Sequence, residues 1–213
     1  GEDVVKKLKN HKVNTDYVMT MPGGMGTWLA VFDHNGDLAG SISQRPNLMP
    51  ILGLLEEKGD EIFANADSVI VEVDMDKDII KKVVALAKQY NKKLYGVVSN
   101  MSIAVERRDF LKHFDCFICN QLEAGMLFME DYADKSPEEL RDILSKRVIL
   151  GKIPAMIVTM GGNGAVYADV NGEKGICPPQ RVRVKDTTGA GDAFCAGVAS
   201  GLTYGKTLSE AVE

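Results

Sequence analysis

Two kinds of hydrophobic spacing alternate along most of the chain. Short apolar, β-branched runs, typical of strands covered on both faces, are separated by longer segments with apolar residues at helical spacing. The run Ser68–Val73 predicts such a strand, and residues 74–90 predict a helix after it. Repeated strand–helix units imply an α/β fold with a mostly parallel sheet and right-handed crossovers. Such a sheet binds ligands at the carboxyl ends of its strands.

The remaining elements follow from the same spacings together with turn and capping residues. Ser136, Pro137 and Glu139 form a strong helix start, and Thr207 with Glu210 forms a second capping box. No repeat or low-complexity segment interrupts the chain, so a single domain is expected over residues 1–213. Further strands are expected at 17–19, 27–32, 38–43, 94–98, 116–119, 155–160, 165–169 and 181–184, with a turn at 33–37, and further helices at 2–10, 104–113, 137–150 and 193–202.

Composition and charge narrow the classes of function. The 213 residues are 45% hydrophobic and 26% charged, which is ordinary for a soluble globular protein. The net charge of −5 argues against charge-driven nucleic-acid binding. It leaves a phosphate ligand open, because helix N-termini and bound cations hold phosphate without net positive charge. No run approaches the ~20 apolar residues of a membrane helix, and the first residues lack an apolar signal core, so a cytoplasmic protein is expected.

The cysteines indicate buried thiols rather than a metal site. Cys116 and Cys119 are formally a C-x-x-C pair, but they fall in an expected strand, where residues three apart point to opposite faces. No second C-x-x-C or paired histidine completes a zinc site. Together with Cys177 and Cys195, they are therefore expected to be reduced core residues.

The segment 186–194, with the sequence DTTGAGDAF, is the most informative for chemistry. An expected strand precedes it and a small, apolar helix follows. Glycines there let backbone N–H groups at a helix N-terminus approach an anion closely. Asp192 in the same turn would repel an anion, which makes sense if it takes the proton of a hydroxyl that attacks phosphorus. A carboxylate that merely complements the helix dipole is the alternative, and the spacing alone leaves both open.

Residues 184–201 resemble the C-terminal signature of the ribokinase-like (PfkB) carbohydrate kinases, whose core motif is D-T-x-G-A-G-D. Asn120 and Glu123 look like the N-x-x-E motif of that family, and residues 159–164 like its T-x-G-x-x-G nucleotide turn. Taken alone, these would be a capping pair and an ordinary hairpin turn. Within the family, residues 26–37 and 160–173 are most similar to pseudouridine kinases, whereas residues 96–100 depart from the Asp-Pro usual in that subgroup.

The resemblance implies transfer of the ATP γ-phosphate to a primary hydroxyl of a sugar or nucleoside. Pseudouridine is the first acceptor it suggests, with ribose or another sugar or nucleoside as the alternative. The implied site residues are Asp192 as base; Gly189, Ala190 and Gly191 as anion hole; Thr159, Gly161 and Gly164 at the nucleotide phosphates; Asn120 and Glu123 at Mg²⁺ and phosphate; and Asp186 with Thr187 at a monovalent cation such as K⁺.

The implied fold is a three-layer ribokinase-like domain with a mostly parallel central sheet and a small β lid. Residues 17–43 are expected to contribute to the lid. The early segment that grips the sugar and the stretch that borders the adenine are absent, so the kinase domain is expected to lack both ends. A small-molecule substrate and a homodimer are the expected partners.

Two other classes of function remain as alternatives. A dinucleotide-binding oxidoreductase would fit the α/β alternation, but no G-x-G-x-x-G lies between an early strand and helix. A catalytically silent binding protein of the same fold is opposed by the intact Asp192 and Glu123.

Overall fold

The computed structural model describes residues 1–32, 38–99, 105–184 and 187–213, which divide into two compact units, 1–56 and 57–213. The first unit contains α1 (Glu2–Asn10), β1 (Thr27–Phe32) and β2 (Leu38–Gln44), and α2 (Met49–Asn65) begins in it. β1 and β2 pair antiparallel, as the hairpin prediction requires, although the expected turn at 33–37 lies outside the described residues. The assignment of this hairpin to a lid within one kinase domain stays a prediction.

The second unit is built on a six-stranded sheet with the order β3-β4-β5-β6-β7-β8. The first four strands are mutually parallel, and the pairs β6–β7 and β7–β8 are antiparallel. The predicted α/β fold with a mostly parallel sheet is therefore confirmed. The strands are β3 (Ser68–Glu72), β4 (Lys93–Val97), β5 (Cys116–Asn120), β6 (Ala155–Thr159), β7 (Ala165–Asp169) and β8 (Lys174–Cys177).

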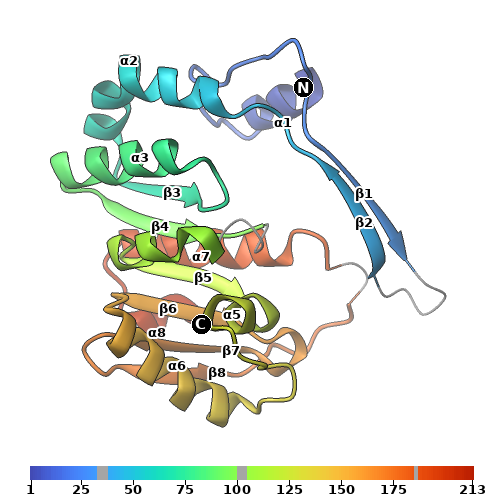
Figure 1. Ribbon diagram of the computed structural model, residues 1–213, viewed down its shortest axis with the longest axis vertical. Helices are drawn as coiled ribbons and strands as arrows, with labels where there is room; N and C mark the ends of the chain where they lie inside the picture. The colour runs from blue at the N-terminus through green and yellow to red at the C-terminus, as the bar shows by residue number, and fades with distance from the viewer. Residues whose placement is uncertain (33–37, 100–104, 185–186) are drawn as a thin grey trace. The chain divides into compact units, whose positions relative to one another are not determined.

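Helices cover both faces of this sheet, which gives three layers. α3 (Lys77–Gln89) and α6 (Pro137–Gly151) lie on one face, and α7 (Ala190–Thr203) and α8 (Leu208–Val212) lie on the other (Figure 1). α3 forms because its apolar residues recur at helical spacing, and it buries that stripe against the sheet. α6 and α8 begin with the predicted capping boxes at Ser136 and Thr207.

Two predicted strands are wrong, and neither α2 nor β8 was predicted. Residues 17–19 form no strand, because β1 and β2 pair only with each other among the described residues. Residues 181–184 are also irregular and exposed, and β8 occupies the place beside β7 instead. The helix expected at 104–113 is present from Val105 onward, as the 3-10 helix η1 (Val105–His113). α2 was not predicted, although the Asn47 Oδ1 accepts a hydrogen bond of 3.0 Å from the Met49 N–H at its start.

The cysteine prediction holds for three of the four residues. Cys116, Cys119 and Cys195 are buried, the first and last of them in the cluster that joins the sheet to α7 and α8. Burial raises the pKa of all three thiols, to about 11 for Cys195, which keeps them protonated and unreactive at neutral pH. Cys177 is only partly buried.

Candidate active site

The carboxyl ends of four parallel strands meet at one edge of the sheet. Glu72 ends β3 in register with Val97 of β4, and Asn120 ends β5 in register with Thr159 of β6. Two of these four, Asn120 and Thr159, are residues that the sequence singled out. Parallel α/β sheets place their ligands at this edge, so topology alone brings these residues toward one site.

A pocket of about 360 Å³ opens at this edge, and we call it the edge pocket. Thr159, Gly161 and Gly164 of the β6–β7 turn line one part of it. Ala190 and Gly191 of the first turn of α7 line another part. The structure therefore brings together two segments, 159–164 and 190–191, that are about 30 positions apart in sequence. The first was predicted to bind the nucleotide and the second to form the anion hole. Cys177 and Phe194 also line the edge pocket, and no motif in the sequence pointed to this position for either residue.

The β6–β7 turn is shaped by glycine. η2 (Gly161–Asn163) forms a single 3-10 turn, and the Met160 N–H donates to the Gly164 carbonyl at 2.8 Å. Gly164 has a φ of 87°, and a Cβ there would lie 2.1 Å from the Cys177 carbonyl oxygen. Only glycine fits so close an approach of the two backbones at this φ. The turn can therefore present main-chain atoms to the edge pocket without side chains in the way.

α7 begins at the edge pocket with an exposed acid in its first turn. Its N-cap, Gly189, has a φ of 79° and no side-chain cap, and Asp192 is the third helical residue. A Cβ at Gly191 would meet nothing within 4 Å, so the backbone is open at that point. The Ala190 N–H donates to the Thr187 carbonyl at 3.1 Å, so that predicted anion-hole donor is engaged in a backbone turn here. Asp192 itself does not line the edge pocket.

Asn120 and Glu123 form a capping box at the start of α5 (Gln121–Phe128). The Asn120 side chain accepts from the Glu123 N–H at 2.9 Å, and the Glu123 Oε2 accepts from the Asn120 N–H at 2.7 Å. The capping interpretation of this pair is thus realised in the structure. Burial raises the pKa of Glu123, against the opposing effect of the hydrogen bond from Asn120. The pair does not line the edge pocket.

Comparison with known proteins decides the family. Residues 1–213 match the sequence pattern described as pfkB family carbohydrate kinase. The chain belongs to this family. It is 35% identical over 221 residues to a guanosine-inosine kinase of Exiguobacterium acetylicum, covering 100% of this chain and 70% of that protein. It is 24% identical over 223 residues to a pseudouridine kinase of Escherichia coli, covering 100% and 66%.

Comparison with a solved structure supports the fold. A ribokinase of Cryptococcus neoformans in complex with ADP superposes with a TM-score of 0.77 at 20% identity, covering 100% of this chain and 70% of that one. The ribokinase-like expectation for the fold is therefore confirmed. The chain spans about two thirds of the length of these relatives.

The donor atoms of this PfkB chain fit a magnesium ion held largely through water. Mg²⁺ in proteins keeps several waters and takes one or two carboxylates as ligands. Burial disfavours the ionised form of Glu123, and a nearby cation would offset that cost. Among the described residues, no group of three or more His, Cys, Asp and Glu side chains forms a complete metal cage. Asp186, the third predicted metal residue, lies outside the described residues.

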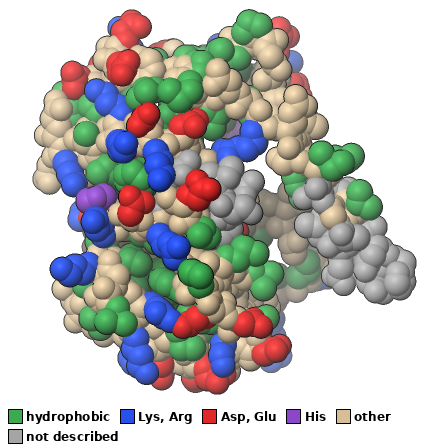
Figure 2. Space-filling model, viewed as in Figure 1, with side chains coloured by type: hydrophobic (Ala, Val, Ile, Leu, Met, Phe, Trp, Pro, Cys, Tyr) green, Lys and Arg blue, Asp and Glu red, His purple; other side chains and the backbone are tan. Residues whose placement is uncertain are grey.

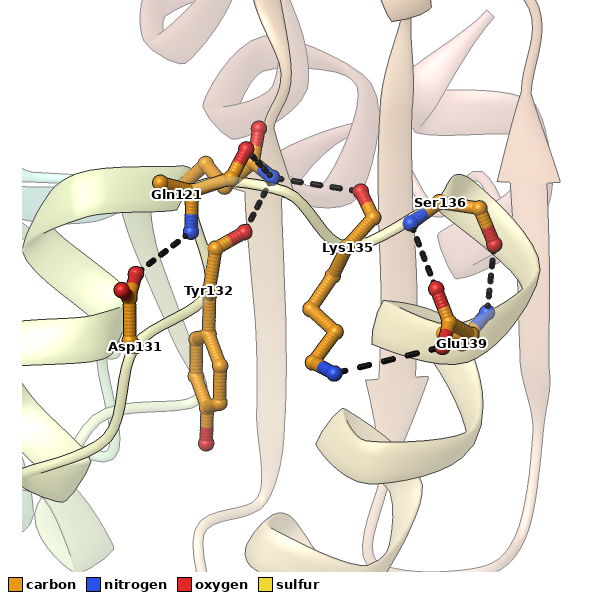
Figure 3. A network of polar contacts seen from close by, with 7 residues as sticks. Gln121, Asp131, Tyr132, Lys135, Ser136 and Glu139 are labelled. Atoms are coloured by element: carbon orange, nitrogen blue, oxygen red, sulfur yellow. Dashed lines mark hydrogen bonds and ion pairs between the residues drawn. The ribbon is translucent and has the colours of Figure 1, made fainter.

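Gln121, inside the N-x-x-E motif, has a role that the sequence did not reveal. Its side-chain N–H groups donate to three carbonyls of one loop, those of Tyr132, Ala133 and Lys135 (Figure 3). That loop leads into the Ser136 cap of α6, where Glu139 accepts from the Ser136 N–H. Gln121 therefore ties the start of α5, with Asn120 and Glu123 beside it, to the start of α6.

Replacing Gln121 with Ala should lower the free energy of unfolding by about 1 to 2 kcal/mol, because three carbonyls lose their shared donor. Urea denaturation measures this change. Leu122→Ala is the matched control, since Leu122 is 63% exposed and its truncation should shift stability by less than about 0.5 kcal/mol. Equal effects of the two variants would contradict a tethering role for the Gln121 amide.

The surface adds two observations on partners. Basic and acidic side chains are interspersed on the face shown in Figure 2, in keeping with the net charge of −5. Within the described ranges of this PfkB chain, no helix is both long and apolar enough to span a bilayer. The expected homodimer and cytoplasmic location stay predictions.

Proposed function

We propose that the protein transfers the γ-phosphate of ATP to a primary hydroxyl of a nucleoside. The observation that supports this best is the edge pocket, where the glycine turn after β6 and the first turn of α7 meet. Both are backbone surfaces suited to phosphate, since the glycines keep side chains away and a helix N-terminus favours an anion. Membership of the PfkB family makes ATP the phosphate donor to test first.

Each part of the site would do a separate task. Gly161 and Gly164 would line the phosphates, and the Gly191 backbone would face the transferring group, where stabilising charge counts most. Asp192, exposed beside Gly191, would accept the proton of the acceptor hydroxyl. Glu123 and Asn120 would hold Mg²⁺, which when bound neutralises phosphate charge. A monovalent cation at Asp186 and Thr187 belongs to the same proposal.

The acceptor proposed first is a purine ribonucleoside such as guanosine or inosine. The support is the 35% identity to a guanosine-inosine kinase across the whole chain, against 24% to a pseudouridine kinase. Pseudouridine, which the sequence interpretation placed first, is the second candidate because residues 26–37 and 160–173 resemble that subgroup. Both acceptors present the same primary hydroxyl to Asp192, so the proposed chemistry is shared.

Acceptor-dependent ADP release separates these candidates. Purified protein with ATP and Mg²⁺ would be assayed with guanosine, inosine, pseudouridine, adenosine, ribose and fructose in parallel. We expect guanosine or inosine to give the highest kcat/KM, at least about tenfold above the sugars, because a matched base pocket contributes binding that a bare sugar lacks. The highest value with pseudouridine would favour the second candidate. ADP release that no acceptor increases, together with tight acceptor binding, would instead favour a silent binding protein.

A further inference from the structure

Glu72, at the end of β3, accepts two hydrogen bonds from Ser99. Its Oε1 accepts from the Ser99 N–H at 2.9 Å, and its Oε2 accepts from the Ser99 Oγ–H at 2.7 Å. Ser99 lies two residues beyond the end of β4. The carboxylate thus uses both oxygens to fasten the segment that leaves β4 to the end of β3.

This contact lies at the same edge of the sheet as the edge pocket and the first turn of α7. The charges of Asp192 and Glu72 both raise the pKa of the Cys195 thiol of α7. α7 packs against β4 and β5, whereas the edge pocket is lined from β6 to β8. Along the sheet order, the strands that α7 packs against therefore lie between β3 and the strands that line the edge pocket.

That placement indicates where an acceptor would bind. In phosphoryl transfer, the attacking and leaving oxygens lie roughly in line across the phosphorus. With the donor phosphates in the edge pocket, the attacking hydroxyl would reach Asp192 from the side away from this pocket, toward the ends of β3 and β4. The exit of β4 at Ser99 then borders the approach of the acceptor.

We propose that Glu72 is a positioning residue for the acceptor, acting by fixing Ser99 at the exit of β4. The proposal rests on the proposed kinase function, and it adds a residue that the family motifs in this sequence do not contain. Glu72 acts through Ser99 and is not itself a catalytic residue.

Glu72 is a partly buried carboxyl group. Burial raises its pKa, and the charge of Asp74 adds to this, while the hydrogen bonds from Ser99 oppose it. Because the folded-state pKa of this acid lies above its unfolded-state value, the ionised carboxylate costs stability at neutral and higher pH.

Two variants separate the effect of losing the hydrogen bonds to Ser99 from the effect of losing the negative charge of Glu72. Glu72→Ala removes both acceptors, and it should raise the acceptor KM about tenfold while the KM for ATP stays within about twofold. Glu72→Gln can keep both contacts, since its Oε1 can accept from the Ser99 N–H and its Nε2 can donate to the Ser99 Oγ. It should retain the wild-type acceptor KM within about threefold and should not lower the melting temperature at pH 8.

Asp115→Ala is the matched control at the opposite edge of the sheet. Asp115 also accepts two hydrogen bonds from a neighbouring strand, from the Lys93 Nζ at 2.7 Å and the Leu94 N–H at 2.9 Å. Asp115 comes directly before β5, and its carboxylate lies beside the first residues of β4. It is therefore at the amino ends of these strands, away from their carboxyl ends. Its loss should lower stability and leave the acceptor KM unchanged.

The experiment is steady-state kinetics of these variants with the best acceptor, together with their melting temperatures. A raised acceptor KM in Glu72→Ala alone supports the proposal. An unchanged acceptor KM in an active Glu72→Ala protein, or an equal rise in Asp115→Ala, overturns it and leaves the proposed function intact. If the wild-type protein phosphorylates no acceptor, the proposed function fails and this proposal fails with it.

Discussion

Replacing Asp192 with Asn should lower turnover by about 10²- to 10⁴-fold, because the amide cannot take the proton of the attacking hydroxyl. Asp192 is exposed in the first turn of α7, so the variant should keep the wild-type fold. ATP binding should persist, since Asp192 does not line the edge pocket. The rate of ADP release at saturating substrates gives the turnover number, and a nucleotide titration gives the affinity for ATP.

Glu139→Gln is the control that separates a base from a dipole-complementing acid. Glu139 holds the same third helical position in α6 that Asp192 holds in α7. Both substitutions remove a negative charge from a helix N-terminus, which costs up to about 1 kcal/mol of stability. Only the Asp192 substitution should cause the large loss of turnover. Near-normal turnover in Asp192→Asn would show that this carboxylate merely complements the helix dipole.

Replacing Gly164 with Ala should lower the free energy of unfolding by at least about 2 kcal/mol and weaken ATP binding. A φ of 87° costs a residue with a Cβ about 1 to 3 kcal/mol. In addition, the new Cβ would lie 2.1 Å from the Cys177 carbonyl oxygen and 2.9 Å from the Pro179 nitrogen, so the backbone of the pocket wall must shift. Chemical denaturation and nucleotide titration measure the two effects.

Gly162→Ala, two residues earlier in the same turn, is the matched control. A Cβ there meets nothing within 4 Å and Gly162 has no positive φ, so its stability should stay within about 0.5 kcal/mol of wild type. A Gly164→Ala protein as stable and as tightly bound to ATP as Gly162→Ala would contradict the role given to this turn.

Local signals in the sequence predicted the elements that place the site. The capping box at Ser136 and the helical spacing after Ile79 specify their helices through neighbouring residues alone. The edge pocket was predictable only in part. Thr159 and Gly191 each belong to a recognisable motif, whereas their meeting in one pocket follows from the sheet order.

What the sequence could not provide depends on contacts between distant segments. Gln121 lies 11 residues from its first acceptor, and Glu72 lies 27 residues from Ser99. Neither spacing belongs to a helix, a strand or a turn, so no periodicity marks these pairs. The strand expected at 181–184 fails for a related reason, since an apolar alternation forms a strand only where a neighbour offers hydrogen bonds.

The central claim is phosphoryl transfer at the edge pocket, and transfer of a labelled phosphate tests it most directly. Purified protein would be incubated with Mg²⁺, a nucleoside and ATP labelled at its γ-phosphate, and the products separated. The account predicts label in the nucleoside 5′-monophosphate, with guanosine or inosine as acceptor, and its near-complete loss in Asp192→Asn. Label found only in ATP and inorganic phosphate, with every acceptor supplied, would contradict it.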